Sequence, residues 1–359
     1  MKVGILTFHN AINYGAILQA YATQQLLSSM GYDAEIIDYH NTFIDKFYAK
    51  YQLNINKLLT LNVFAFIKSI IVSISYYRRL KRYCLFYSNI KLSGKQYNLG
   101  DRIDGYDIIM IGSDQVWNTR LTHGFDDMYW GAFQVPRGTR KIAWAVSMGD
   151  ADTTGKKEEI ALRLKYFDKI SVRENSLKLF LNSLTDQKIY VTVDPTMLIK
   201  DVWTPLCKPV KESGYILVYA VKDLPITMTV ARRIANEFHK KIIVINAYPY
   251  KSRGNGVKQS CGPQDFLSYI NHASMVVTSS FHGTVFSILF KKVFFSVIPD
   301  NKSNERISDL LISLGLEDRI VNENKDIHLL NSIDYNYVDK KMSQLREYTL
   351  SFLIQSMNI

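Results

Sequence analysis

The stretch that most restricts the possible folds is residues 272–299, HASMVVTSSFHGTVFSILFKKVFFSVIP. Residues 274–280 form an apolar, β-branched run that ends in hydroxyls, which is typical of a strand covered on both faces of a parallel sheet. Residues 284–292 then have the apolar spacing of a short helix that ends in two lysines, and an apolar strand over 293–298 follows at once. A strand, a helix and a second strand in this order predict the α/β class.

His282 lies where the first of these strands is expected to lead into the helix. Open α/β sheets bind ligands at this carboxyl edge, and the backbone N–H groups at a helix N-terminus attract anions. The neighbours Ser279, Ser280, Gly283 and Thr284 are small or carry hydroxyls. These residues predict a functional histidine in an anion-binding turn. The alternative is a histidine that caps a helix inside a packed core.

The same alternation of strands and helices runs through most of the chain. Strands are predicted over residues 2–8, 34–39, 106–112, 141–147, 168–172, 190–193, 215–221 and 241–247. Helices are predicted over residues 16–30, 227–238, 263–271, 307–314 and 339–357. The pattern predicts an N-terminal Rossmann-like domain over 1–202, with a helical insertion at about 41–100, a C-terminal Rossmann-like domain over 203–335, and a C-terminal helix over 336–359.

Polar or charged residues follow five strands of the predicted first domain. They are Asn13, Tyr14 and Gly15 in the loop after the first strand, then Ser113 with Asp114, Ser147, Arg173 with Glu174, and Asp194. Parallel strands bring their carboxyl ends to one edge of a sheet, so this repetition predicts a ligand-binding cleft there. For the first loop, a tight turn without a ligand is the alternative.

The predicted insertion contains an apolar segment over residues 59–77 that is followed by Arg78, Arg79, Lys81 and Arg82. Polar residues interrupt the segment, and no unbroken run reaches the roughly 18 to 20 residues that a membrane-spanning helix needs. An apolar face that ends in cations is typical of an interfacial helix, which predicts peripheral contact with the anionic inner face of a membrane. A helix packed on the protein is the alternative.

Composition excludes several other classes. The formal net charge is +11, but the sequence has no helix-turn-helix, zinc-finger or RNP-like pattern, so nucleic-acid binding is not predicted. The three cysteines are widely spaced, form no metal-ligand pattern and cannot all pair with one another, which favours a reducing compartment. The first ten residues predict a strand and not a signal peptide, so we expect a cytoplasmic protein.

Seven blocks in this order resemble the polysaccharide pyruvyl transferase family. They are Asn13-Tyr14-Gly15-Ala16 with Leu18-Gln19-Ala20-Tyr21, Gly112-Ser113-Asp114-Gln115-Val116-Trp117, Ser147-x-Gly149, Ser171-Val172-Arg173-Glu174, Asp194-Pro195-Thr196, Ser279-Ser280-Phe281-His282-Gly283-Thr284, and the terminal helix. The resemblance covers nearly the whole chain. It implies a GT-B-like fold with two facing Rossmann-like domains, and a reaction in which phosphoenolpyruvate forms a ketal with a sugar diol and loses phosphate.

The resemblance also implies site residues. The family's histidine corresponds to His282, as proton donor, and the arginine of its Arg-Glu block corresponds to Arg173, as anion clamp. Many members carry an arginine where this chain has Ser280, and Arg306 is a candidate to replace that cation. Asp114 and Glu174 are candidates to accept hydroxyl protons. We expect donor contacts from the turn residues, which are Asn13, Tyr14, Gly15, Ser113, Ser147, Ser279, Ser280, Gly283 and Thr284.

The resemblance implies no metal and no cofactor, with phosphoenolpyruvate as the donor substrate bound between the two domains. The acceptor would be a sugar or a lipid-linked oligosaccharide in bacterial capsule or exopolysaccharide biosynthesis. Two alternatives stay open: a glycosyltransferase of the same build that uses a nucleotide sugar, and a non-catalytic protein that binds glycans or anions. Binding of a sugar nucleotide without binding of phosphoenolpyruvate would favour the glycosyltransferase, and the missing arginine at Ser280 keeps the non-catalytic alternative open.

Overall fold

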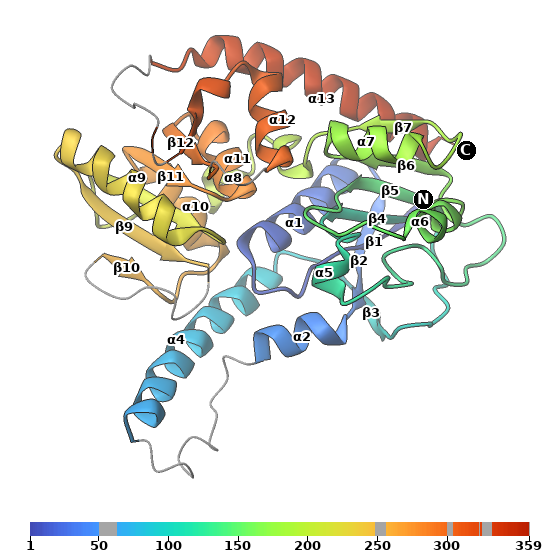
Figure 1. Cartoon of the computed structure of the whole chain (residues 1–359). Coiled ribbons are helices and arrows are strands. Elements are labelled where there is room, and N and C mark those ends of the chain that lie inside the picture. The colour runs from blue at the N-terminus through green and yellow to red at the C-terminus, as the bar shows by residue number, and fades with distance from the viewer. Residues whose placement is uncertain (50–62, 248–255, 300–303, 323, 325–331, 359) are drawn as a thin grey trace. The chain divides into compact units, whose positions relative to one another are not determined.

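The computed structural model describes residues 1–49, 63–247, 256–299, 304–322, 324 and 332–358, and Figure 1 shows the order of the elements along the chain. The chain divides into two compact units. The first unit comprises Met1–Phe47, Asn89–Lys200 and Asp339–Ile359, and the second comprises Tyr48–Ser88 and Asp201–Val338.

The first unit contains a seven-stranded sheet with the strand order β3-β2-β1-β4-β5-β6-β7. The strands are β1 (Lys2–Leu6), β2 (Asp33–Tyr39), β3 (Leu92–Tyr97), β4 (Ile108–Asp114), β5 (Arg140–Val146), β6 (Lys169–Val172) and β7 (Ile189–Val191). Neighbouring strands pair in parallel, so their carboxyl ends lie along one edge. The order reverses between β1 and β4, the position where doubly wound sheets bind ligands.

Helices and buried side chains complete the first unit. Its helices are α1 (Tyr14–Ser29), α2 (Thr42–Ala49), α5 (Thr119–Thr122), α6 (Lys157–Leu164) and α7 (Asn175–Asn182), with the 3-10 turn η1 (Pro195–Met197). Every residue of β4 is buried, as expected for a central strand covered on both faces. The apolar run of the sequence therefore directs β4 to the middle of the sheet.

The second unit repeats this topology in a six-stranded sheet with the order β10-β9-β8-β11-β12-β13. The strands are β8 (Tyr215–Ala220), β9 (Lys241–Asn246), β10 (Val257–Lys258), β11 (Met275–Thr278), β12 (Val293–Val297) and β13 (Ile320–Val321). The helices are α8 (Trp203–Leu206), α9 (Leu224–Glu237), α10 (Pro263–His272), α11 (Phe281–Leu289) and α12 (Glu305–Leu314), with the 3-10 turn η2 (Glu317–Arg319). All described pairs are parallel, and the order reverses between β8 and β11.

Burial explains why α9 covers this second sheet. Val230 and Ile234 of α9 pack against Ile216 and Val218 of β8 and against Val277 of β11, and all five are buried. The helical period in residues 227–238 places these side chains on one face of the helix. The two doubly wound units confirm the predicted α/β class with two Rossmann-like domains.

The predicted strands and helices agree with the observed ones to within a few residues, but several elements were not predicted, among them α6, α7, β10, β13 and the strand β3. The strand β3 lies inside the segment of about 41–100 that was predicted to be helical. Only Tyr97 of this strand is buried, and the other side chains are polar, small or partly exposed. An edge strand of this composition lacks the apolar run by which the buried strands were recognised.

The helix α4 (Val63–Tyr87) belongs to the second unit and is not an insertion of the first domain. Its Arg79 is buried and donates three hydrogen bonds to backbone carbonyls after β9 and β10. Nη1 donates to Ala247 O at 2.6 Å, and Nη2 donates to Asn246 O at 2.5 Å and to Gln259 O at 2.9 Å. The predicted boundaries therefore differ from the observed ones, because a cation of α4 satisfies carbonyls of the second unit.

The last helix, α13 (Tyr335–Met357), joins the first unit from Asp339 onward. Arg346 donates to the carbonyl of Met197, and Arg140 of β5 donates to the carbonyls of Met357 and Asn358 at 3.1 and 2.9 Å. These bonds return the C-terminal segment to the N-terminal unit. The predicted separate helix over 336–359 is thus part of the first unit.

The exposure of side chains on α4 limits which of the residues predicted to contact a membrane can do so. Residues 59–62 of the predicted apolar segment lie outside the described residues. Ile67, Ile71 and Ile74 are exposed, and the exposed Arg78 follows them on the same helical face. Arg79 is buried and cannot meet a lipid surface. No helix among the described residues is long and apolar enough to cross a bilayer.

We expect Arg79→Ala to destabilise the second unit. The substitution leaves the carbonyls of Asn246, Ala247 and Gln259 without their common donor, at a cost of about 1–3 kcal/mol each. The free energy of unfolding should fall by at least ~3 kcal/mol, while the exposed neighbour variant Arg78→Ala stays within about 0.5 kcal/mol of the parent. Calorimetric melting of both variants measures this difference. Equal melting temperatures would show that the three bonds contribute little.

Candidate functional site

A buried ion network holds the carboxyl ends of three strands of the first sheet. Arg173, directly after β6, donates from Nη1 to Asp194 Oδ2 at 2.6 Å and from Nη2 to Asp114 Oδ1 at 3.0 Å. The side chains of Arg173 and Asp194 are 2% and 0% exposed, whereas that of Asp114 is 12% exposed. Burial opposes the charge, but the carboxylates of Asp194 and Asp114 raise the pKa of Arg173, so it stays cationic.

This geometry bears on the predicted role of Arg173 as an anion clamp. Both terminal nitrogens bond to carboxylates, so a substrate anion would have to use the other N–H groups of the guanidinium beside Asp114 and Asp194, or displace one of them. Removing a partner from a buried charge pair costs about 3–5 kcal/mol. In the described structure, the network fixes the position of the Asp114 carboxylate.

Glu174 lies beside this network and has a partner on the neighbouring strand end. The Ser147 hydroxyl, after β5, donates to Glu174 Oε1 and accepts from Gly149 N at 3.0 Å. Ser113 Oγ donates to Ala145 O at 3.1 Å. Ser113, Ser147 and Glu174 were predicted to take part in the ligand site. All three are buried, and in this structure they bond to other groups of the protein at the sheet edge.

The backbone at the end of β4 has a left-handed conformation that places Asp114. Asp114 has φ 74°, and Gly112 has φ 117°. A Cβ added at Gly112 would lie 2.2 Å from Trp144 O, so only glycine fits there. A non-glycine residue with this φ is uncommon and often marks a functional position. Asp114 is therefore the carboxylate of the network that this backbone conformation holds at the carboxyl end of β4, with its side chain 12% exposed.

The loop after β1 carries the predicted residues Asn13, Tyr14 and Gly15 at the start of α1. Asn13 caps this helix, because its Oδ1 accepts from Gly15 N at 2.9 Å and from Ala16 N at 3.3 Å. Tyr14 is 1% exposed. The loop lies at the strand-order reversal between β1 and β4, as expected for a ligand-binding loop, and Asn13 has a capping role there in addition.

In the second unit, β11 leads into α11 as the sequence predicted, and Ser280 is the N-cap of that helix. Its hydroxyl accepts from Gly283 N at 3.3 Å, which explains a serine at this position in structural terms. A Cβ on Gly283 would lie 2.3 Å from Thr278 Oγ1, so glycine allows the close packing of the turn on β11. His282 lies in the first turn of α11 and is 7% exposed.

Hydroxyl groups fix the remainder of this turn. Ser279 Oγ donates to Lys222 O at 2.7 Å, in the loop after β8. Thr284 Oγ1 and Ser296 Oγ of β12 lie 2.7 Å apart and share a hydrogen bond. Ser279 thus joins the loops on either side of the strand-order reversal, whereas Thr284 has a buried structural role.

Arg306 of α12 lies close to this turn, although it is 24 residues after His282 in the chain. Its guanidinium carbon is 5.6 Å from the ring centroid of Phe281, whose ring contacts the His282 ring at a centroid distance of 5.3 Å. A cation stacked on Phe281 is therefore next to the N-terminus of α11. This position fits the candidate that was predicted to replace the cation absent at Ser280.

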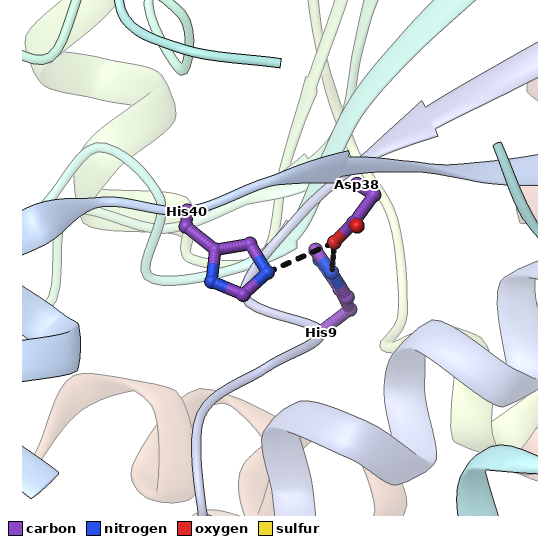
Figure 2. Close-up of side chains that lie close together, drawn as sticks. All are labelled: His9, Asp38 and His40. Atoms are coloured by element: carbon purple, nitrogen blue, oxygen red, sulfur yellow. Dashed lines mark hydrogen bonds and ion pairs between the residues drawn. The ribbon is translucent and has the colours of Figure 1, made fainter. Parts of the chain in front are cut away.

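A cluster that the sequence analysis missed consists of His9, Asp38 and His40, at the carboxyl ends of β1 and β2 (Figure 2). His9 Nε2 and His40 Nε2 lie 3.0 and 2.9 Å from the same oxygen, Asp38 Oδ1. The hydrogen bond from His9 lowers the pKa of Asp38, and the bond to Asp45 raises the pKa of His40. The sequence contained one indication of this cluster: a histidine shortly after each of two strands, β1 and β2, which pair with each other in the sheet.

Two independent comparisons now bear on identity. The family model for polysaccharide pyruvyl transferase matches residues 13–301, most of the chain. The chain belongs to the polysaccharide pyruvyl transferase family. The match includes Arg173, Glu174, Asp114 and His282, whereas His9 lies just outside it. A search of curated protein sequences gave no match.

Comparison with solved structures shows that this family member resembles a UDP-GlcNAc 2-epimerase in fold. The UDP-GlcNAc 2-epimerase of Methanocaldococcus jannaschii matches with a TM-score of 0.50 at 12% identity, over 96% of this chain and 93% of that chain. A putative UDP-N-acetylglucosamine 2-epimerase of Listeria monocytogenes gives 0.46 at 10% identity, over 99% and 90%. The spinosyn rhamnosyltransferase SpnG gives 0.40 at 8% identity, over 99% and 95%. At these identities the likeness concerns the GT-B-like α/β fold alone.

Proposed function

We propose that this family member transfers pyruvate from phosphoenolpyruvate to two hydroxyls of a sugar, forming a ketal during bacterial capsule or exopolysaccharide biosynthesis. Family membership supports pyruvyl transfer, and the observation that carries the proposal is the position of His282 in the first turn of α11, next to Phe281 and Arg306. The turn combines a group that can donate a proton with a place for an anion. Phosphoenolpyruvate requires this combination, because its methylene carbon must gain a proton and its anionic groups must be bound.

The reaction needs three kinds of help from the protein. The methylene carbon of phosphoenolpyruvate gains a proton and becomes a methyl group, which leaves a cationic carbon that the sugar hydroxyls attack. The bond from that carbon to the phosphate oxygen breaks as the second hydroxyl adds. Of the two hydroxyl protons, one balances the proton given to carbon and the other leaves with phosphate. An acid, an anion site and a base therefore suffice, without a redox cofactor.

His282 is the proton donor in this proposal. Histidine is the side chain that exchanges a proton most readily near neutral pH. His282 is mostly buried, and the ring of Phe281 lies against it. Gly283, which no larger residue can replace without meeting Thr278, keeps the turn that presents the ring. Low exposure and the edge contact with Phe281 restrict the orientation of the ring, which favours proton transfer to a defined carbon.

The donor's anionic groups are assigned to the N-terminus of α11 and to Arg306. The N-terminal turn of a helix presents backbone N–H groups and carries the positive end of the helix dipole. Arg306 adds a full charge and a planar pair of donors suited to carboxylate or phosphate. This assignment differs from the anion clamp predicted at Arg173, whose guanidinium bonds to Asp114 and Asp194.

Asp114 is the proposed acceptor of a hydroxyl proton. Of the carboxylates in the first unit's network it is the more exposed, and Arg173 and the left-handed backbone at φ 74° fix its position. Glu174 is the alternative, but it is buried and accepts the Ser147 hydroxyl. Arg173 then acts as a positioning residue for Asp114.

Donor binding tests the anion site. Phosphoenolpyruvate at ~100 times its dissociation constant should stabilise the parent by roughly 2.7 kcal/mol, seen as a rise in melting temperature. Arg306→Met should weaken binding roughly 10- to 100-fold, because a charged hydrogen bond contributes about 1.5–3 kcal/mol. Arg232→Met, an exposed arginine of α9, is the matched control and should bind like the parent.

Two outcomes would contradict this proposal. A rise in melting temperature with UDP-GlcNAc and none with phosphoenolpyruvate would favour a glycosyltransferase. Equal shifts with inorganic phosphate and phosphoenolpyruvate, together with no phosphate release in the presence of any sugar acceptor, would favour a non-catalytic anion-binding protein.

Turnover tests the proton donor. We expect His282→Gln to lower the rate of acceptor-dependent phosphate release ~10²- to 10⁴-fold, while the dissociation constant for phosphoenolpyruvate changes much less. His239→Gln, at a histidine two residues after α9, serves as the control and should keep the parent rate. The melting temperatures of both variants should match the parent. Normal turnover in His282→Gln would mean that the histidine only packs in the turn.

We further propose that the exposed side of α4 places the protein at an anionic membrane, where a lipid-linked acceptor would be found. Ile67, Ile71 and Ile74 supply an apolar face, and Arg78 and Lys81 are exposed at its C-terminal side. Arg79 is buried and Arg82 bonds to Asp265 at 2.7 Å. Each cation near such a surface contributes about 1 kcal/mol.

Sedimentation with vesicles tests this contact. The parent should bind vesicles that contain anionic lipid more tightly than neutral ones, and the double variant Arg78→Gln, Lys81→Gln should lose most of that preference. A double variant of two exposed lysines at the ends of α6, Lys157→Gln with Lys165→Gln, should retain it. The same binding to neutral and anionic vesicles, or none to either, would rule out an electrostatic membrane contact.

A further inference from the structure

We propose that His9, Asp38 and His40 form a binding site for a divalent transition-metal ion at the carboxyl edge of the first sheet. The sequence analysis implied no metal for this family, and the proposed pyruvyl transfer requires none. The inference therefore stands on the geometry of these three residues and is independent of the proposed function.

The ligand atoms have the spacing that a metal ion requires. His9 Nε2 and His40 Nε2 lie 3.0 and 2.9 Å from Asp38 Oδ1, and one ligand atom from each residue lies within 4.8 Å of the others. Bonds of about 2.0–2.2 Å to nitrogen and oxygen place neighbouring ligands roughly 3–3.5 Å apart. The two nitrogen–oxygen spacings lie at the short end of this range or within a tenth of an ångström of it. Figure 2 shows both rings directed at the Asp38 carboxylate.

The other nitrogen of each ring has a neighbour that can only accept. His9 Nδ1 lies 3.3 Å from the carbonyl oxygen of Thr7, and His40 Nδ1 lies 3.2 Å from Asp45 Oδ2. A hydrogen on each Nδ1 satisfies both contacts and leaves Nε2 as the atom that can bind a metal ion. A neutral ring would then direct the lone pair of Nε2 at Asp38. That arrangement is repulsive unless positive charge lies between the groups.

A metal ion supplies that charge and explains the remaining contacts. Metal-binding histidines usually donate their second N–H to a carboxylate or a backbone carbonyl, which are the partners of His40 and His9 here. Asp45 is itself fixed, because Asn10 Nδ2 donates to its Oδ1 at 2.7 Å. A proton on each ring is the competing explanation, and it predicts no metal affinity.

Exposure is consistent with an ion that enters from solvent. The side chain of His9 is 2% exposed, whereas those of Asp38 and His40 are 23% and 35% exposed. The site thus has one deep ligand and two near the surface. Three protein ligands leave at least one position for water or a substrate oxygen.

The ligand types select the class of metal. Two imidazoles and one carboxylate suit Zn²⁺ and other first-row divalent ions, whereas Mg²⁺ and Ca²⁺ prefer oxygen ligands alone. The strands β1 and β2 provide a rigid support for the ligands, since Asp38 lies in β2 and His9 and His40 follow closely after strand ends. We therefore expect Zn²⁺ to bind and Mg²⁺ not to compete.

Calorimetric titration of the chelator-treated full chain with Zn²⁺ tests the site. The parent should bind one equivalent, and excess Mg²⁺ should not displace it. Asp38→Asn, which changes one atom of a ligand, and His40→Ala, at a partly exposed position, should each weaken binding at least ~100-fold. Asp45→Asn leaves the three ligands in place and should weaken binding about 10- to 100-fold. Melting curves without metal show whether each variant is folded.

Two control variants separate this site from other zinc ligands on the protein. His123→Ala removes an exposed histidine of the same unit, and Cys84→Ser removes the exposed thiol. Both should bind Zn²⁺ like the parent. The proposal is overturned if the parent binds no stoichiometric Zn²⁺, or if Asp38→Asn and His40→Ala bind as tightly as the controls. Either result would mean that the cluster holds protons only.

Discussion

The ion network of Arg173 is the interaction on which the first unit's functional edge depends. A buried guanidinium is tolerated only when carboxylates compensate its charge, and here Asp114 and Asp194 do so from the ends of two other strands. Asp194 also accepts from Thr196 N at 3.0 Å and so starts the turn η1. Loss of this one cation would leave two carboxylates facing each other at the strand ends, so the position of Asp114 follows from Arg173.

The second unit stabilises the corresponding edge differently: the buried Arg79 bonds to backbone carbonyls at the ends of β9 and β10, and hydroxyls hold the turn before α11. Thr278, Ser280, Thr284 and Ser296 bond to one another or to nearby backbone groups, and a helix N-terminus with Arg306 near it supplies the positive potential. The two edges are thus chemically different, although their strand orders are equivalent. The first offers carboxylates and the second offers a cation and a histidine.

The site of His9, Asp38 and His40 adds a third kind of chemistry to the first unit. It lies over β1 and β2, next to the strand-order reversal, and Thr7 connects the two regions. The Thr7 carbonyl faces His9 Nδ1, while its hydroxyl donates to Ser113 O at 3.0 Å. Thr7 therefore contacts both the His9 ring and the backbone at the end of β4.

The sequence by itself determined the class of fold and the positions of His282, Asp114 and Arg173 at strand ends, because strand and helix periodicity is local and parallel strands end at a common edge. It did not determine which unit contains α4, since the carbonyls bound by Arg79 are up to 180 residues away in the chain. It also could not reveal the partners of Arg173 or the meeting of His9 with His40. Those contacts depend on which strands become neighbours and on how each side chain is directed across the edge, and only tertiary packing decides both.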